Sequence, residues 1–554
     1  MRRSPILAVG AAILAVAAPA ALAQGLFQGV PNANPKAGHP PNVLASGFTL
    51  HPITEGSRQL ENPTSVFDTF GFLNDAGAPN IEATKTEPDQ NTYLTLNNPG
   101  GPTPGYNYGR HFLFQGHEAE NDHAYVTRIN LDVKDPTHRV TLLTPGNGST
   151  TGFNDLDGST WDPFAQTMIY TQEDGSDGGA ISQSPFWNST TPPAVTSLDG
   201  SFGKGGFEGI HPDAKGDVYI VEDSGGQTVP IDPNNAASSK TAKQPNSYVY
   251  RFVPDNPSDL THGKLQVLQV TVDGTPLTET CTPTPAVHPT SCPSTQAQAS
   301  ADVFSQAQLD LHSGNSFPAK FVTIHDTHTD GTAPFDANQA AKGINNHGAG
   351  AVGTPFQRPE NGSFQPDTGF TNFFFVATGD TDSHPAANPA LVARGTWGSI
   401  FRLHLQVDGG MTGNVKQFAL GDADHASFDN TTFADDNTLL VAEDRGDGLH
   451  TQLNKLDSVW AYRVNKPPSQ AQRLIALGRD PASEADSILG SVTLPPGFTF
   501  QNEGDNEPTG VFVSDGSAAK NGLLGTKAPN PGKARTFFTQ QHGENHVWEI
   551  TPTP

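Results

Sequence analysis

Short apolar runs recur along the chain, and each lies between segments rich in glycine, aspartate, asparagine and proline. From residue 206, Gly-Phe-Glu-Gly-Ile-His-Pro-Asp is followed by the run Val218 to Val221 and then by Glu-Asp-Ser-Gly. Similar patterns start near residues 158, 358, 428 and 507. The runs are short, rich in β-branched and aromatic residues, and lack a helical period. The pattern therefore predicts pairs of strands in an all-β fold.

A third strand is predicted downstream of most repeats, at 247–252, 398–403, 458–462 and 546–550, and a similar run at 123–129 ends an earlier unit. Small sheets repeated at this spacing favour a β-propeller of about six blades over a sandwich. Long insertions rich in Pro, Thr, Asn, Ser and Ala are expected to form loops on the propeller faces. They cover roughly 227–244, 274–314, 326–353 and 465–496.

The chain is predicted to have three parts. Residues 1–23 combine two arginines, an apolar run and an Ala-Leu-Ala cleavage pattern, so we interpret them as a signal peptide. Residues 24–108 lack a clear blade pattern, and we interpret them as an irregular arm that packs on the propeller and could add an outer strand to the last blade. Residues 109–554 are interpreted as the propeller. The paired arginines leave the route of export open.

Composition narrows the partners and the compartment. The 31 Lys and Arg residues against 57 Asp and Glu give a formal net charge of -26, which disfavours nucleic acid and anionic membrane surfaces. Mean hydropathy is -0.44, and we expect no membrane span after signal cleavage. We expect a monomer. Cys281 and Cys292, the only cysteines, are predicted to form a local disulfide in the periplasm or outside the cell.

Acidic residues recur at corresponding points of the repeats. In a propeller the innermost strand of each blade lines the central channel, so a recurring side chain forms a ring around the axis. Gathered carboxylates raise one another's pKa unless a cation neutralises them, and oxygen ligands suit calcium above all. The residues predicted to bind metal are Glu118, Glu173, Glu208, Glu360, Asn430, Glu443, Asp444 and Glu507, and Glu222 ends a second strand in the same way as Glu173 and Glu443.

Four segments resemble motifs of one family in the same order. Gln115–Glu118 resembles the Asn-His-Glu of the PhoX-type alkaline phosphatases, and Phe356–Glu360 resembles their Phe-x-Arg-Pro-Glu. Asp429–Asp444 is similar to their Pro-Asp-Asn and Leu-x-x-x-Glu-Asp, and Glu507–Gly543 to their closing Glu-x-x-Gly, Asp-Gly and Phe-x-x-x-Gln-x-x-Gly. The resemblance spans roughly residues 110–550.

The resemblance implies a six-bladed propeller that carries calcium and iron and hydrolyses phosphate monoesters outside the cytoplasm. The family has a cysteine ligand in an Asn-Cys-x-Gly-Gly stretch, whereas the corresponding region here, Phe153–Thr160, offers Asp155 and Asp157. A thiolate helps to select iron, and these aspartates supply only hard oxygen atoms. We therefore expect Ca²⁺ and leave iron open.

Two arginines are candidates for binding a phosphoryl group. Arg358 lies in the Arg-Pro-Glu segment, and Arg445 follows Glu443 and Asp444. A planar guanidinium can bind two phosphate oxygens at once. Either arginine could instead form a salt bridge with a nearby ligand carboxylate, so both roles stay open.

The histidines give weaker signals. His117 and His542 lie inside the family-like motifs and could orient Glu118 and the final blade from behind the ligands. His325 and His328 form a single His-x-x-His, which could bind metal or transfer a proton.

Three functions fit the sequence. The first is an exported metal-dependent hydrolase of phosphoric esters, with a small phosphate ester as substrate. The second is a calcium-dependent lactonase or arylesterase, in which calcium polarises a carbonyl and activates water. The third is a non-catalytic envelope protein whose calcium serves stability alone.

Overall fold

The structure is a computed structural model. It describes Leu22 and residues 27–73, 85–119, 122–145, 153–187, 192–232, 240–283, 291–344, 350–379, 388–482 and 504–553. The predicted signal peptide, apart from Leu22, and parts of the four predicted insertions lie outside the described residues. No helix in the described ranges is long and apolar enough to cross a membrane.

The described chain forms six antiparallel blades around one axis, which confirms the predicted all-β propeller. The first blade consists of β3 (Glu87–Thr95), β4 (His111–Glu118), β5 (Tyr125–Asn130) and β6 (Val140–Pro145). The second consists of β7 (Leu156–Asp162), β8 (Thr167–Gln172), β9 (Ala180–Gln183) and β10 (Val195–Ser197). The third consists of β11 (Phe207–Pro212), β12 (Val218–Glu222), β15 (Val249–Asn256) and β16 (Asp259–Val272).

The remaining blades follow the same order from the axis outward. The fourth contains β19 (Pro359–Phe364), β20 (Asn372–Ala377), β21 (Ser399–Leu405) and β22 (Thr412–Leu420). The fifth contains β23 (Phe428–Phe433), β24 (Thr438–Glu443), β25 (Ser458–Arg463), β26 (Gln472–Ala476) and the edge strand β1 (Val43–Leu44). The sixth contains β27 (Glu507–Ser514), β28 (Arg535–Gln541), β29 (His546–Pro552) and β2 (Phe48–Thr54).

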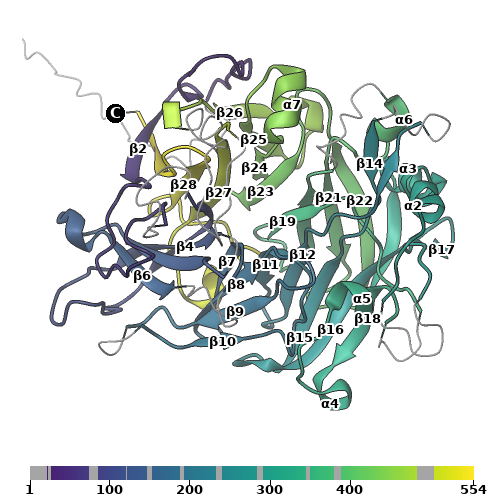
Figure 1. Cartoon of the computed structure of the whole chain (residues 1–554), viewed down its shortest axis with the longest axis horizontal. Coiled ribbons are helices and arrows are strands. Elements are labelled where there is room, and N and C mark those ends of the chain that lie inside the picture. The colour runs from purple at the N-terminus through teal and green to yellow at the C-terminus, as the bar shows by residue number, and fades with distance from the viewer. Residues whose placement is uncertain are drawn as a thin grey trace, which may run out of the picture.

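The innermost strand of each blade contacts the innermost strands of both neighbours, so that β3, β7, β11, β19, β23 and β27 close a ring. The labels β7, β11, β19, β23 and β27 lie around the centre of Figure 1. The sixth blade combines strands from opposite ends of the sequence, because β2 pairs with β29. The predicted contribution of an outer strand to the last blade is thus confirmed.

Part of the predicted arm belongs to the propeller itself. Residues 87–95, which fall inside the expected range 24–108, form β3, the innermost strand of the first blade. The first blade therefore begins before residue 109. The division into leader, arm and propeller otherwise stays a prediction.

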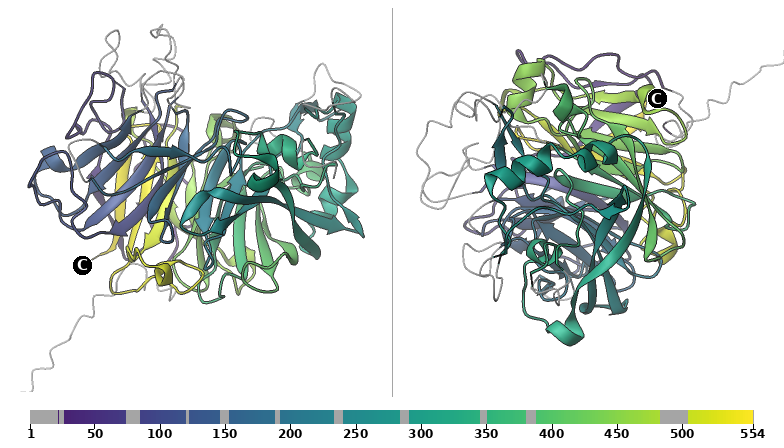
Figure 2. Two further views of the ribbon diagram at one scale, coloured as in Figure 1. Left: turned by 90° about the horizontal axis from the view of Figure 1, so that it is seen from below. Right: turned by 90° about the vertical axis from the view of Figure 1, so that its right-hand side faces the viewer.

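An additional strand joins the third and fourth blades. β18 (Ser316–Asp326) pairs with β16 on one side and β22 on the other, so the two blades form one continuous sheet. Figure 2 shows the teal insertion around it at one edge of the molecule. The other elements are β13 (Thr228–Pro230), β14 (Thr241–Lys243), β17 (Thr275–Pro276), α2 (Gln296–Val303), α3 (Gln306–Leu311), α4 (Thr327–Asp330), α5 (Ala337–Ala341), α6 (Pro389–Val392), α7 (Gly446–Leu453) and the 3₁₀ turns η2 (Pro136–His138), η4 (Pro468–Gln470) and η5 (Lys520–Gly522).

The hydrophobic core is divided among the interfaces between blades. Apolar side chains from facing sheets bury one another, as expected where sheets pack face to face. Phe114 and Tyr170 lie in the cluster between the first two blades, and Tyr93 and Phe537 lie in the cluster that joins the first blade to the last. Corresponding clusters fill the other four interfaces.

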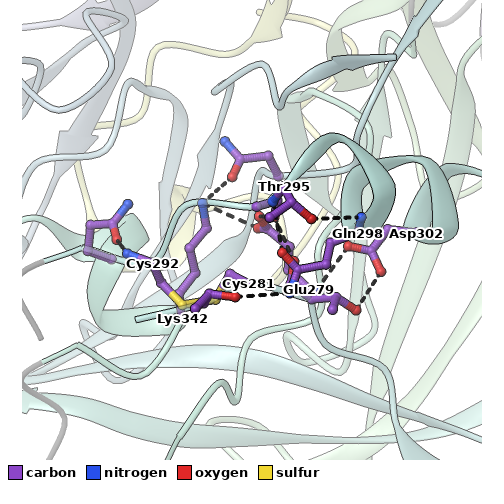
Figure 3. The surroundings of a disulfide bond; sticks show 12 residues. Glu279, Cys281, Cys292, Thr295, Gln298, Asp302 and Lys342 are labelled. Carbon is purple, nitrogen blue, oxygen red and sulfur yellow. Dashed lines mark hydrogen bonds and ion pairs between the residues drawn. A yellow bond between two sulfur atoms is a disulfide. The ribbon is translucent and has the colours of Figure 1, made fainter. Parts of the chain in front are cut away.

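The disulfide is present as predicted. Cys281 and Cys292 are bonded, with their Cα atoms 5.3 Å apart. Beside the bond, the backbone N–H of Cys292 donates to the side-chain oxygen of Gln339 at 2.7 Å, and the ammonium group of Lys342 lies 3.3 Å from the Glu279 carboxylate (Figure 3). A disulfide of this kind is typical of proteins that fold in an oxidising compartment.

Candidate metal centre on the propeller axis

A polar cavity of about 350 Å³ opens on the axis where the innermost strands begin. Ten carboxylates line it, together with one arginine, one glutamine and one histidine. The lining residues are Glu87, Asp89, Glu118, Asp157, Glu173, Glu208, Arg358, Glu360, Asp429, Asp444, Glu507, Gln541 and His542.

Four of the carboxylates occupy the same position in four successive blades. Asp157, Glu208, Glu360 and Asp429 are each the second residue of an innermost strand. Because strand pairing is equivalent in each blade, equal positions lie at equal heights along the axis. The repeat of the sequence is therefore converted into a ring of carboxylates.

The first and last blades differ because proline occupies that second position. Pro88 and Pro508 stand there, and the cavity carboxylates are the residues beside them. Glu87 and Glu507 open their strands, and Asp89 follows Pro88. Because successive side chains of a strand point to opposite faces, the residues beside each proline lie on the other face from it.

Each innermost strand is irregular at its cavity residues or just beyond them. The register with the second strand shifts once in all six blades, between Leu156 and Ser159 in the second blade and between Phe207 and Ile210 in the third, for example. Bulges of this kind add a residue, bend the strand and re-aim side chains. The irregularity is thus part of what directs the acidic side chains to the axis.

Glycine allows the innermost strands to approach one another at this point. A Cβ atom on Gly158, the residue after Asp157, would lie 2.1 Å from the carbonyl oxygen of Glu208. That carbonyl also accepts a hydrogen bond from the Thr171 hydroxyl at 2.5 Å. A side chain at 158 would therefore separate the second and third blades at the cavity wall.

Three further carboxylates come from the ends of the second strands. Glu118 is the last residue of β4, and Glu173 and Asp444 follow the last residues of β8 and β24. Asp223, after β12, does not line the cavity but binds Arg358, which does. The second strands therefore add a second layer of acidic groups around the same axis.

The register explains why some predicted residues are absent from the lining. Phe207 pairs with Glu222, Phe428 with Glu443, and Leu156 with Gln172. Glu173 therefore corresponds to Asp223 and Asp444, not to Glu222 and Glu443. Because side chains alternate between the two faces of a strand, a difference of one residue places a side chain in a different environment.

Glu443 and Arg445 pair with each other away from the cavity. Their side chains are 2.7 Å apart, and both are completely buried. Arg445 also donates to the backbone oxygens of Leu456 and Asp424, at 3.1 and 2.9 Å. The salt-bridge role that the sequence left open is the one that the structure gives Arg445.

Asn430 is likewise outside the lining. Its side-chain oxygen accepts from the backbone N–H of Gly510 at 2.5 Å, and its amide donates to Asp429 at 2.8 Å. The register makes Asp429 the counterpart of Glu208, so the neutral exception expected in the ring is replaced by an aspartate.

The remaining sequence candidates lie elsewhere or play supporting roles. Glu222 accepts from Tyr250 of the third blade at 2.8 Å and from Asn338 of α5 at 2.9 Å. His117 is hydrogen-bonded to Thr86 and Thr127 and does not face Glu118's cavity.

The His-x-x-His pair is not part of the cavity either. His325 stacks on Phe335, with ring centroids 3.8 Å apart. His328 binds the Asp255 carboxylate at 2.7 Å on the surface.

His542 does lie in the lining. Its Nε2 atom is 3.4 Å from carboxylate oxygens of both Glu87 and Glu507. Burial lowers the pKa of His542, which favours a neutral ring that can donate to one carboxylate. The expected supporting role in the last blade fits this position.

Three lining carboxylates approach closely enough to share one ion. Ligand oxygens of Asp89, Glu118 and Asp157 all lie within 4.8 Å of one another. One oxygen each of Asp89, Asp157 and Glu208 is buried without a hydrogen-bond partner. A buried carboxylate oxygen that lacks a donor is costly unless a cation compensates it. The residues present thus fit a metal ion.

The raised pKa values of the cavity carboxylates also indicate that the cavity suits a cation. Burial, and then the neighbouring carboxylates, raise the pKa of Glu118, Asp157, Glu208 and Asp429 well above their ordinary values. Burial, together with Asp223, raises the pKa of Glu360 to about 7. These groups cannot all be ionised at neutral pH unless cations balance them.

Arg358 is the one arginine in the lining. Its Nε and Nη2 atoms contact Asp223 at 2.8 and 2.6 Å, and Nη2 lies 3.6 Å from Glu360. The backbone of Arg358 has φ of 52°, a left-handed conformation that is uncommon outside glycine. Such strain is typical of positions where a side chain must point in one direction, here into the cavity.

Sequence reasoning did not single out Glu87 and Asp89. Both belong to the range interpreted as an arm, so no blade was expected there. The signal that identifies them is the pair Glu87-Pro88, which repeats Glu507-Pro508 at the start of the last blade. Gln541 and Asp429 lay inside recognised motifs without being assigned a role.

Comparisons with known proteins support the fold. No protein-family model and no curated protein matches the chain. The structure is similar to Pseudomonas fluorescens PhoX in complex with vanadate, a transition state analogue, with a TM-score of 0.52 and 11% identity over 95% of this chain and 98% of that one. At that identity the similarity shows a shared propeller fold.

Two more distant similarities are to other solved structures. TolB from Acinetobacter baumannii has a TM-score of 0.28 at 10% identity, over 84% of this chain and 64% of that one. The PQQ-bound aldose sugar dehydrogenase from Streptomyces coelicolor has a TM-score of 0.26 at 10% identity, over 76% of this chain and 99% of that one.

Proposed function

We propose that this protein is an exported, calcium-dependent hydrolase of phosphoric esters. The observation that carries the proposal is the axial cavity, where ten carboxylates from all six blades surround a single arginine. The propeller shares its fold with PhoX, whose structure holds vanadate, a transition state analogue. An exported protein with a local disulfide and an acidic overall charge is consistent with this assignment.

Calcium is the ion that best suits the donors. Every carboxylate in the lining offers hard oxygen, and calcium accepts six to eight such ligands in irregular geometry. Both cysteines are joined in the disulfide, so neither offers the thiolate that would favour iron. Asp89, Glu118 and Asp157 would hold one ion, which when bound supplies positive charge for a phosphoryl group.

The chain's own residues would orient the substrate. A phosphate ester is repelled by a chain of net charge -26, so its binding in the acidic cavity would require bound cations. Arg358 offers a planar guanidinium that Asp223 and Glu360 hold in one orientation. The remaining N–H groups of that guanidinium are available for phosphate oxygens as negative charge develops on them.

The test is hydrolysis by the purified, calcium-loaded protein of three substrate classes: p-nitrophenyl phosphate, an aryl acetate and a lactone. We expect turnover of the phosphate ester, inhibition by vanadate and loss of activity on chelation. Arg358→Gln should lower kcat/KM for the phosphate by about 100-fold, as removal of a charge-stabilising donor typically does, with calcium content unchanged.

Arg402→Gln is the matched control, because Arg402 lies on β21 of the same blade and outside the cavity lining. It should leave kcat/KM unaltered. Turnover of the acetate or lactone alone would replace the proposal with a lactonase or arylesterase. If neither class reacts while calcium still raises the melting temperature, the protein is a calcium-binding propeller without catalysis.

A further inference from the structure

A second pocket lies at the other end of the strands that build the metal cavity. Its lining includes Tyr93 and Thr95 of β3, His111 of β4 and Arg535 of β28. Glu87, Glu118 and Gln541 are at the opposite ends of the same three strands. With a rise of about 3.3 Å per residue, six or seven residues separate the two sites by about 20 Å. The second pocket is therefore distinct from the metal cavity.

The charge of this pocket contrasts with that of the whole chain. Arg110, Lys527, Lys533 and Arg535 line it, against the acidic residues Asp132 and Asp515. The chain as a whole has 31 basic and 57 acidic residues. The lining of this pocket therefore contains more basic than acidic residues, whereas the chain as a whole contains more acidic residues.

Three of the basic side chains have no partner in the described part of the chain. Arg110 contacts Asp132 through its backbone N–H only, and Lys533 donates to Asn530 through its backbone only. Lys527 makes no hydrogen bond or ion pair with a described residue. Arg535, in contrast, binds Glu549 through two contacts of 2.7 Å. The pocket thus has cationic groups that form no ion pair with the acidic residues of its lining.

The two acidic residues of the lining are already occupied by local donors. Asp132 accepts from the backbone N–H and the ring of His111, at 3.1 and 2.8 Å. Asp515 accepts from the backbone N–H groups of Ser517 and Asn530, at 3.1 and 3.0 Å. The Asp515 contacts connect two positions of the loop between β27 and β28, and neither acidic residue forms an ion pair with Lys527 or Lys533. Figure 2 shows this yellow connection at one end of the blades.

We infer that this pocket, lined by Arg110, Lys527 and Lys533, binds a phosphate-type oxyanion that carries two or more negative charges. A guanidinium binds two oxygens in its plane, and two ammonium groups add charge from other directions. The hydroxyls of Thr95 and Ser517 lie in the same lining and can donate to the remaining oxygens. The oxyanion is either free or the terminal group of an ester, and the ring of Tyr93 beside it could contact an ester substituent.

The test is lysine footprinting of the full mature protein with an acetylating reagent at low ionic strength, followed by mass spectrometry. Inorganic phosphate should protect Lys527 and Lys533 in a saturable way. Exposed Lys320, on β18, is the internal control and should react equally with and without phosphate. Because the readout is specific to each lysine, binding of phosphate in the metal cavity does not contribute to it.

Arg110→Gln should raise the phosphate concentration for half-protection about fivefold, the effect of losing one exposed ionic contact. Added salt should weaken protection further, because exposed charges are screened. Phenylphosphonate, which cannot be hydrolysed as an ester, identifies the source: tighter protection than with phosphate indicates an ester-linked group, and equal or weaker protection indicates the free anion. Unprotected lysines at millimolar phosphate, or protection that Arg110→Gln leaves unaltered, would overturn the inference.

Discussion

Glu443 and Asp444 are neighbours in the chain with different surroundings. Asp444 lines the cavity, whereas Glu443 is sealed in a buried pair with Arg445. Removing the charge of each should therefore have different consequences. A carboxylate in the proposed metal centre should contribute to cation binding, and a carboxylate in a buried pair to folding.

We predict that Asp444→Asn lowers calcium affinity at least about tenfold, since even groups that only support a ligand often contribute that much. Glu443→Gln should leave calcium affinity unchanged. It should lower the free energy of unfolding by about 3 kcal/mol, because Arg445 would keep a buried charge without its partner. Calcium titration calorimetry and urea unfolding measure the two effects. Equal loss of calcium affinity in both variants would contradict the register between β23 and β24.

The pair Glu443-Asp444 illustrates how far the cavity residues can be predicted from the sequence. Recurrence of Glu-Asp at the ends of three second strands indicates acidic residues at the axis, and most of the candidates do line it. Which residue of each pair faces inward depends on the register with the neighbouring strand and on the bulge beyond it. That register follows from long-range pairing, which the local pattern of residues does not encode.

At the scale of elements, α7 is held by one buried histidine. His450 lies 2.8 Å from Asp457 and 3.3 Å from Asp505. Asp505 also binds Lys36 and Arg479. The ion pairs therefore join α7, the segment before β27, the segment after β26 and the N-terminal region. Arg445, which borders Asp457, completes the charged surroundings of the helix.

This network predicts a pH dependence of stability. Burial alone lowers the pKa of His450, but Asp457 and Asp505 outweigh it and raise the pKa to about 10. The folded state then binds the proton more tightly than the unfolded chain, whose histidine has a pKa of about 6.5. The stabilisation is complete below pH 6.5 or so and is lost as the pH rises through about 10.

His450→Gln should therefore lower the free energy of unfolding by about 3 kcal/mol at pH 6, and by much less at pH 10.5. Urea unfolding at the two pH values measures the difference. His328→Gln is the control, because His328 is exposed and pairs with Asp255 on the surface. A His450→Gln penalty that is the same at both pH values would show that the histidine is not protonated in the fold.

The strands themselves were predicted where their pattern is apolar and missed where it is polar. β3 reads Glu-Pro-Asp-Gln-Asn-Thr before its first aromatic residue. These polar side chains are buried against neighbouring blades: the Asn91 amide donates to the Gly510 carbonyl, and Gln90 accepts from the Ser159 backbone. An innermost strand beside a polar channel need not alternate apolar and polar residues, so the pattern gives no signal there.

For the whole molecule, electrostatic repulsion among the cavity carboxylates affects how stably the six blades close into a ring. Acidic residues from every blade converge on one axis, and the two ends of the chain meet in the last blade. Without cations, repulsion among these groups acts to separate the blades. With cations, the same groups connect all six blades through shared ligands, so metal binding and folding are linked.

Chelation of metal from the purified protein should accordingly lower its thermal midpoint by several degrees, and calcium should restore it. An ion present at a hundredfold excess over its Kd stabilises by about 2.7 kcal/mol, and several ions add to this. Magnesium should restore less, since it prefers a smaller octahedral site. Metal content before and after chelation is measured by elemental analysis.

The double variant Asp157→Asn/Glu208→Gln tests whether these two carboxylates repel each other in the metal-free protein or stabilise the fold by packing. Both residues are buried in the cavity, and each has a carboxylate oxygen without a donor. In the metal-free protein the variant should melt at a higher temperature than the wild type, because two mutually repelling charges are gone. In calcium it should melt at a lower temperature, because two ligands are gone. A variant that loses the same stability with and without calcium would mean that these carboxylates support the fold by packing alone, and that they are not calcium ligands.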